Sequence, residues 1–380
     1  MKRSFKILFY GFIICCSGIV CKKNYNPPAI HTNYNYLVVN GGLISDPDSP
    51  SVISLGRTVI LTDTTSSFSV EPGAVITAQS DAGDKIQFSE TRPGNYIAAP
   101  QVLSYLKKYR IDITTANGSN YTSDYVPLMK APGIDSVTWQ QNTDATIYVN
   151  GHGSGEDTRY YRWDFIETWQ YTAPLSRSIA ESNGFIYYVD STNQTYNCWI
   201  SGFSKNILTG TSAALSENII SSQPVITIPR EDARLAVKYS ILVRQYGITA
   251  EAYTYLSTLQ KNTESLGSVF DAQPTQFTGN IHCINNPSET VIGYICASTM
   301  TMQRIFIKNN QLEDWNYVDP HADCSLVEIG QNQANFLIYD YPDTSYAPYY
   351  FVSPSDIKLA KRSCVDCTTQ GGTTNRPVYW

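Results

Sequence analysis

One segment of the chain combines aromatic rings with a carboxylate in a pattern that suits ligand chemistry. It runs from Tyr160 to Tyr171 and reads YYRWDFIETWQY. Successive side chains of a strand point to opposite faces, so one face is expected to carry Tyr161, Trp163, Phe165, Glu167, Trp169 and Tyr171. A carboxylate among aromatic rings is typical of a sugar-binding surface or of the general acid of a glycosidase.

The same pattern also fits a plain aromatic core stripe, because aromatic side chains bury large areas and build cores routinely. In that case Glu167 would be paired with an arginine. We favour the core interpretation over a ligand face, and a ligand face over catalysis. The ligand-binding candidates are Tyr161, Trp163, Glu167, Trp169 and Tyr171. A glycosidase needs a second carboxylate at a defined separation, so a Glu167 buried against an arginine would exclude it.

The cysteines predict a disulfide framework. Apart from Cys15, Cys16 and Cys21 near the N-terminus, the chain contains an even number of cysteines, as many exported proteins do. They are Cys198, Cys283, Cys296, Cys324, Cys364 and Cys367. We favour a Cys283–Cys296 bond across the Asn286-Pro287 turn, with Cys198 and Cys324 bonded to the two tail cysteines. The tail CVDC sequence lies in a turn-rich segment without a βαβ pattern, which favours a structural staple over redox chemistry.

Other catalytic or metal-binding patterns are weak. The histidines are scattered and match no metal-ligand spacing, so we expect no metal site, no cofactor and no catalytic residue. The segment Gly151-His152-Gly153-Ser154-Gly155 looks like a nucleophile loop. It lacks the GxSxG spacing, and we interpret it as a flexible connector.

The N-terminus predicts export and lipidation. Lys2, Arg3 and Lys6 precede an apolar stretch that ends at Cys21. The stretch is shorter than the roughly 20 apolar residues of a membrane span, which favours a signal peptide over residues 1–20 against an uncleaved anchor helix. Gly18-Ile19-Val20 resembles a lipobox, so Cys21 is the expected acylated residue, with Cys15 and Cys16 as competitors. Residues 21–35, with Pro27-Pro28, are expected to form a lipidated tether.

Composition indicates a β-dominated protein with a sizeable core. Of 380 residues, 42% are hydrophobic, 16% are charged and 28 are tyrosines. Tyrosine and β-branched hydrophobic residues suit half-buried strands. The formal net charge is −6. An acidic chain without a basic run is a poor candidate for nucleic-acid binding.

The elements that would position these residues are short strands separated by regular turn signals, which predict β-sandwich architecture. Asn117-Gly118 is the clearest hairpin signal. We expect an immunoglobulin- or transthyretin-like sandwich over residues 36–132, with a boundary at Ala131-Pro132-Gly133. Residues 133–380 should form a larger β-rich domain with a disulfide-bearing tail. Its one main helix begins after Thr249, which is a suitable N-cap, and Gly267 is expected to stop it.

The chain resembles the Bacteroidota outer-membrane lipoprotein family known as domain of unknown function 4249. The matching stretches cover nearly all of the chain after the tether: Tyr36–Gly41, Leu55–Thr58, Tyr160–Trp163, Glu167–Trp169, Tyr239–Val243, Glu251–Tyr253, Phe270–Pro274, Gly279–Ile281, Gly293-Tyr294, Cys364–Cys367 and the tail to Trp380.

The resemblance implies an outer-membrane lipoprotein, often encoded beside TonB-dependent receptors that import nutrients, and it supplies no catalytic residue. We therefore expect a non-catalytic protein that captures a small ligand or glycan, or that partners such a receptor. A structural component of an envelope complex is the second hypothesis and a glycan-acting hydrolase the third. Lys22-Lys23 replaces the acidic residues frequent after the lipidated cysteine in surface-exported relatives, although we favour the cell surface over the periplasmic face.

Overall fold

The computed structural model describes residues 35–59, 69–155, 157–182, 185–190, 192, 194–264, 278–330, 345–353 and 356–380. The predicted signal peptide, Cys21 and all but the last residue of the tether lie outside these ranges. The protein is mainly β, as the composition predicts. No helix within the described ranges is long and apolar enough to cross a membrane.

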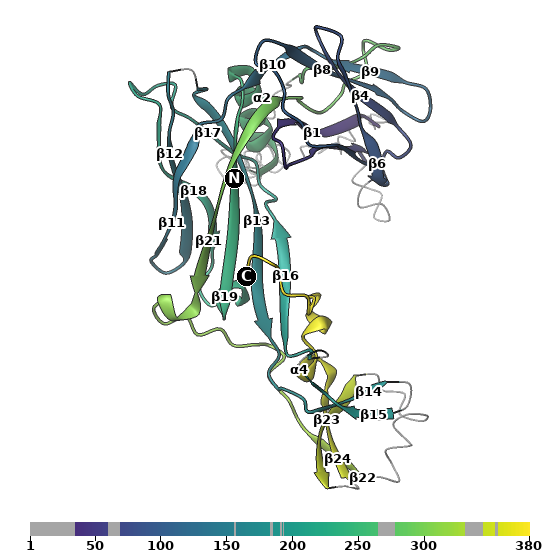
Figure 1. Ribbon diagram of the computed structural model, residues 1–380, viewed down its shortest axis with the longest axis vertical. Helices are drawn as coiled ribbons and strands as arrows, with labels where there is room; N and C mark the ends of the chain where they lie inside the picture. Colours follow the sequence, from purple (N-terminus) through teal and green to yellow (C-terminus); the bar gives the residue numbers. More distant parts are fainter. Residues whose placement is uncertain are drawn as a thin grey trace, which may run out of the picture.

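The N-terminal strands form a β-sandwich (Figure 1). One layer is built on β1 (Leu37–Ser45) and β2 (Ser51–Arg57), the other on β4 (Val75–Ser80) and β8 (Lys108–Thr114). Alternate residues of these strands are buried, as the two-residue period of a strand requires. The layers are extended by β3 (Ser69–Val70), β5 (Lys85–Gln87), β6 (Ser89–Arg92), β7 (Asn95–Ala98), β9 (Asn120–Ser123) and β10 (Val126–Met129).

The predicted Asn117-Gly118 hairpin is confirmed. Strands β8 and β9 pair antiparallel with Ile113 opposite Tyr121. Gly118 has φ +86°, a left-handed conformation that suits glycine. The turn thus brings Tyr121 into the sandwich core, where it is 1% exposed.

The sandwich core is completed by a segment from much further along the chain. Strand β20 (Ile281–Cys283) pairs with β9, and Val291, Ile295 and Ala297 join the same buried cluster. The N-terminal core therefore depends on residues 281–297. The division of the chain into domains at 132/133 stays a prediction.

A second sandwich forms the middle of the molecule. Its long sheet places β13 (Tyr160–Thr172) beside β19 (Lys238–Gly247), which pairs with β21 (Ala297–Lys308). On its other edge β13 pairs with β16 (Asn197–Phe203) and β17 (Leu208–Thr211). The facing sheet has the order β11 (Gly133–Gln141), β12 (Ala145–His152), β18 (Ile219–Ile228). Short turns of 3₁₀-helix flank it at η1 (Ala233–Leu235) and η2 (Asn309–Gln311).

The predicted main helix is α2 (Ala250–Glu264). The backbone N–H of Ala252 donates to Oγ1 of Thr249 over 3.2 Å, which confirms the N-cap. Ala252 and Tyr255 are buried on the face that packs against the sheets. Gly267, the expected stop, lies outside the described residues.

A smaller unit lies at the end of the molecule away from the N-terminal sandwich (Figure 1). It contains the hairpin β14 (Ile179–Ser182) and β15 (Phe185–Tyr188) and the sheet order β22, β24, β23. From here the C-terminal tail returns along β16, where Trp199 bridges to Thr373. The remaining elements are β22 (Val327–Gly330), β23 (Tyr346–Ser353), β24 (Asp356–Lys361), α4 (Arg362–Val365) and η3 (Cys367–Gln370).

Two disulfides staple this tail. Cys198 of β16 bonds to Cys367, and Cys324 bonds to Cys364. The expectation that the tail cysteines bond to Cys198 and Cys324 is thereby confirmed.

The predicted Cys283–Cys296 bond is wrong, because both thiols are free. The prediction assumed that these cysteines lie on neighbouring strands of a hairpin. Instead, Cys283 pairs with Tyr121 of β9. Cys296 precedes β21, and its carbonyl oxygen accepts the N–H of Leu43 in β1 at 2.8 Å. The two cysteines therefore face different strands.

Replacing Cys198 and Cys367 with serine should lower the free energy of unfolding by about 2–4 kcal/mol. The bond spans a sequence separation of 169 residues, so its loss frees a long loop in the unfolded chain. Denaturant unfolding of the wild-type and variant proteins measures the change. Alkylation of the unfolded, unreduced protein should modify Cys283 and Cys296; finding either of them blocked would contradict the assigned pairing.

Candidate functional site

The aromatic segment forms β13, and its predicted ligand face is a core face. Tyr161 is 1%, Trp163 2% and Tyr171 7% exposed. Trp169 is half-buried and packs on the cluster that contains Trp163. The rings therefore lack an open surface on which a sugar could stack. The core interpretation, which we favoured from the sequence, holds, and the alternative of a ligand-binding face is corrected.

The polar edges of these rings are used inside the core. Nε1 of Trp163 donates to Oε1 of Gln245 at 2.8 Å, and Nε2 of Gln245 donates to the carbonyl of Pro132 at 2.9 Å. The hydroxyl of Tyr161 is hydrogen-bonded to Asn218. Buried tryptophan and tyrosine need such partners. The network ties β13 to the segment that links the first sandwich to the second.

Glu167 is held by two partners. It accepts a hydrogen bond from the Tyr239 hydroxyl at 2.8 Å and pairs with Arg234 at 3.2 Å. Arg234 also pairs with Asp232 at 2.9 Å. Burial, reinforced by the charge of Glu167, raises the pKa of Tyr239 well above its ordinary value, which keeps the phenol a donor. This is the arginine-paired arrangement that we set out as the alternative to catalysis.

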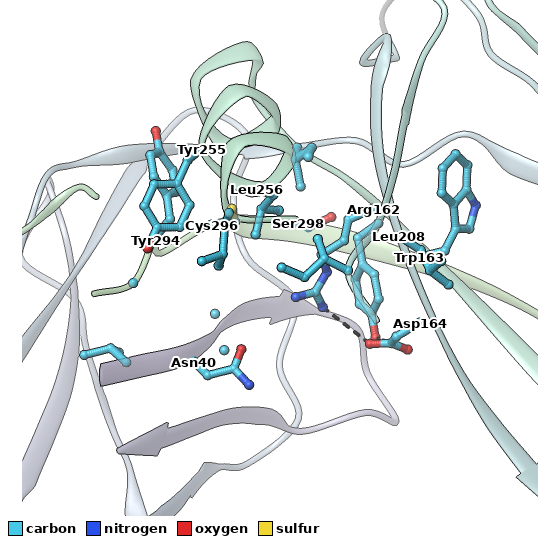
Figure 2. Close-up of a pocket in the computed structure, with 18 of the residues that line it drawn as sticks. Asn40, Arg162, Trp163, Asp164, Leu208, Tyr255, Leu256, Tyr294, Cys296 and Ser298 are labelled. Atoms are coloured by element: carbon cyan, nitrogen blue, oxygen red, sulfur yellow. Dashed lines mark hydrogen bonds and ion pairs between the residues drawn. The ribbon is translucent and has the colours of Figure 1, made fainter. Parts of the chain in front are cut away.

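A pocket of about 420 Å³ lies where the N-terminal sandwich meets the central sheet (Figure 2). Strand β1 forms one wall, α2 another, and the outer face of β13 with the β16–β17 connection a third. Much of its lining is aliphatic or aromatic, with a few polar groups between. Partly open, mostly apolar clefts of this size at a junction between units are a usual place for small ligands.

Glycines let the walls approach each other. Gly41 has φ +129°, and a Cβ there would lie 2.1 Å from the carbonyl oxygen of Val52. At Gly42 an added Cβ would lie 2.6 Å from the carbonyl oxygen of Cys296. Both glycines line the pocket, together with Gly293. A larger residue at Gly41 would push β1 away from β2, and one at Gly42 would push β1 away from the chain before β21.

One wall of the pocket carries an ionic cluster. Arg162 and Asp164 of β13 lie directly opposite Tyr246 and Arg244 of β19. Asp164 accepts from Nε of Arg244 at 2.5 Å and from the Tyr246 hydroxyl at 3.3 Å. The Arg162 guanidinium lies over the Tyr246 ring, 4.5 Å from its centre. Burial, with the charge of Asp164 next, raises the pKa of Tyr246 to about 12.

The opposite end of the pocket is aromatic. The rings of Tyr255 on α2 and Tyr294 lie 5.4 Å apart, and the thiol of Cys296 lies beneath the helix (Figure 2). Leu256 and Leu259 continue the helical wall. Burial raises the pKa of the Cys296 thiol to about 11, so this end presents an apolar surface at neutral pH.

A second, more open pocket of about 540 Å³ lies on the core side of β13. Glu167 and Arg234 form part of its lining, beside Phe203, which is 66% exposed. Lys205 lines both pockets, because the β16–β17 connection lies between them. The hydrogen bonds of Glu167 within this pocket are the structural ones given above.

The other sequence candidates are not assembled into a site. Nδ1 of His152 lies 2.8 Å from Asp135, whereas the Ser154 hydroxyl donates to Asp157 at 2.9 Å. The two side chains therefore use different carboxylates rather than one triad. Across the described ranges, no group of three or more His, Cys, Asp or Glu side chains could hold a metal ion.

Sequence reasoning missed the pocket. The alternation that assigns Trp163 to one face of β13 also assigns Arg162 and Asp164 to the other face, and this signal could have been used. Nothing in the sequence shows that Tyr246, Tyr255 and Tyr294 meet there, because they come from three different elements. Three of the stretches that carry the resemblance do contribute to the pocket, through Asn40-Gly41, Arg162-Trp163 and Gly293-Tyr294.

The model of the family described as "Domain of unknown function (DUF4249)" matches residues 22–304. The chain belongs to this family. Every residue that lines the first pocket falls inside the matched range. Cys324, Cys364 and Cys367 lie beyond it, so the tail part of the resemblance stays a prediction. No curated protein matches the chain.

Replacing Glu167 with alanine should destabilise this DUF4249 member by about 1–3 kcal/mol, because it leaves the buried Tyr239 hydroxyl without its acceptor and removes one of the two carboxylates that pair with Arg234. The matched control is Glu328→Ala, whose carboxylate pairs with Lys358 at 2.5 Å but is 51% exposed. An exposed pair of this kind contributes little. Denaturant unfolding compares the two variants, and equal effects would show that Glu167 is not a structural residue.

Alkylation of Cys296 in the folded protein should accelerate about tenfold per pH unit between pH 7 and pH 10, because only the thiolate reacts. Its raised pKa of about 11 means that the rate should still be rising at pH 10. Peptide mapping after iodoacetamide treatment measures the rate, with glutathione as the thiol of ordinary pKa. A rate that levels off near pH 9 would contradict a buried Cys296.

Proposed function

We propose that this protein is an outer-membrane lipoprotein, anchored through Cys21, that captures a small ligand in the pocket between its two sandwiches. It acts without a cofactor as the accessory partner of a TonB-dependent nutrient transporter. The anchor and location rest on the sequence, through the basic start, the apolar stretch and Cys21. We favour the cell surface over the periplasmic face of the outer membrane.

The pocket itself carries the capture proposal. Its 420 Å³ are lined mostly by apolar side chains, with a few polar groups and one cation-bearing wall, which is the usual composition of a ligand site. Its walls come from β1, β13, α2 and the segment before β21, so the pocket exists only when the two sandwiches are joined. A site built on rigid strands in this way is preorganised for a ligand.

The contacts of Glu167, the best acidic candidate in the sequence, support capture rather than catalysis. Glu167 accepts from Tyr239 and pairs with Arg234, and these contacts account for its carboxylate structurally. In the first pocket, Asp164 is likewise engaged by Arg244 and Tyr246. Both carboxylates are therefore occupied by arginine and tyrosine partners.

An exposed aromatic surface supports the proposed binding to a partner transporter. In the β14–β15 hairpin Phe185 is 77% and Tyr188 75% exposed. Aromatic residues are enriched at protein interfaces, and the hairpin lies at the other end of the molecule from β1 and α2, which line the pocket (Figure 1). The same surface would also serve an envelope assembly, which is the second candidate function.

The deciding experiment is a mild-detergent pull-down of the tagged protein from its native membrane, with mass spectrometry of proteins and extracted small molecules. Wild-type protein should recover a TonB-dependent transporter and carry a bound small molecule. Leu256→Trp, which fills the pocket, should lose most of the small molecule and keep the transporter. Thr254→Trp adds the same ring on the exposed side of α2 and should retain both.

The controls separate the alternatives. Cys21→Ala should leave the membrane fraction, because its acyl chains provide the anchor. Recovery of assembly machinery without any small molecule would favour the structural role. Equal retention of a small molecule by wild-type and Leu256→Trp protein would show that capture does not use this pocket.

A further inference from the structure

We propose that the ligand of this pocket is an apolar monocarboxylate, held at its carboxylate by Arg162 and along its apolar body by α2. The inference rests on the proposed capture function and names the ligand class. It follows from three features of the pocket: an arginine with unused donors, an excess of positive charge and an apolar far end.

Arg162 has more hydrogen-bonding capacity than the protein uses. A guanidinium has five N–H donors. In the described part of the chain, its hydrogen bond is the one from Nη2 to Asp164 at 3.4 Å, which is long. Asp164 accepts shorter hydrogen bonds from Arg244, at 2.5 Å, and from the Tyr246 hydroxyl. Arg162 is therefore not needed to neutralise Asp164, and the other N–H donors of its guanidinium remain available to a ligand.

The orientation of Arg162 is fixed toward the pocket. Stacking on the Tyr246 ring at 4.5 Å restrains the guanidinium plane. Figure 2 shows the guanidinium pointing from β13 into the space between α2 and β1, on the side where Asn40 lies. The Arg162 side chain is 31% exposed, so a ligand can reach it. A restrained planar fork matches a carboxylate through two parallel hydrogen bonds.

The charge around the pocket favours an anion. Among the residues that line the pocket, Arg162 and Lys205 are positive and Asp164 is the one carboxylate, which Arg244 already engages. The whole chain, in contrast, has a formal net charge of −6. A positive pocket in an acidic protein concentrates anions locally and repels cations. Lys205 lies exposed on the β16–β17 connection, where it can guide the anion to the entrance.

The rest of the pocket requires an apolar body. Leu208, Leu256 and Leu259 form its walls, and the Tyr255–Tyr294 pair closes the end opposite Arg162 (Figure 2). A sugar acid would leave its hydroxyl groups without partners against these side chains, at a cost of about 1–3 kcal/mol for each. A flat aromatic acid and a medium-length fatty acid share the required chemistry.

The test is isothermal titration calorimetry of the purified full chain with decanoate, 2-naphthoate, decanol and decylamine, each below its aggregation limit. The chain structure provides a closely matched control for Arg162→Met. Arg110 also lies on a tyrosine ring, at 5.1 Å, and pairs with the carboxylate two residues later, at 3.3 Å. Its side chain is 33% exposed on the N-terminal sandwich, away from the pocket.

Decanoate or 2-naphthoate should bind at least about tenfold more tightly than decanol, the worth of a charge-assisted hydrogen bond, and decylamine should bind most weakly. Arg162→Met should remove this preference for the acid, whereas Arg110→Met should keep it. Which of the two acids binds more tightly identifies the shape of the apolar body. If Arg162→Met did not fold, exposed Lys205→Ala decides instead: its affinity for the acid should fall about two- to fivefold at low salt.

Equal affinity for acid and alcohol, or an unchanged preference in Arg162→Met, would overturn carboxylate recognition while leaving apolar capture intact. Unchanged acid affinity in Lys205→Ala at low salt would do the same where that variant is the one used. Failure of all four compounds would overturn the ligand class. The proposed capture function would then be judged separately, by the small molecule recovered from the native membrane.

Discussion

The architecture depends on the insertion of one short segment between two strands of the N-terminal sandwich. Ala297, at the start of β21, pairs in parallel with Leu43 of β1 and with Leu128 of β10. The same strand then continues antiparallel along β19 in the central sheet. Gly42 permits this because a Cβ there would collide with the Cys296 carbonyl. One strand thus belongs to both sandwiches and fixes their mutual position.

The pocket is a consequence of that joint. The chain before β21 brings Tyr294 and Cys296 against β1, and α2 covers the space that remains beside β13. No single sandwich contains all of its walls. Because the walls are strands and a capped helix, the orientation of Arg162 toward the pocket is held by backbone pairing with β19 rather than by a loop.

The two faces of strand β13 have different roles. Its inward face packs Tyr161, Trp163 and Phe165 into the second core. Its outward face presents Arg162 and Asp164 to the pocket. The two-residue period of a strand keeps these roles separate while placing them one residue apart. Substitutions at neighbouring positions are therefore expected to affect either stability or binding.

The sequence by itself determined the β-rich class, the Asn117-Gly118 hairpin, the helix capped by Thr249 and the bonding of the tail cysteines, because each follows from local propensity, turn chemistry or the even number of cysteines. It favoured burial of the aromatic face of β13 but did not show that Arg162 and Asp164 of the opposite face line a pocket. Tertiary structure alone decided that Cys283 and Cys296 stay apart and that Arg162, Tyr246 and Tyr294 meet. Those contacts depend on the non-local pairing of β21 with β1 and β10, for which the sequence carries no local signal.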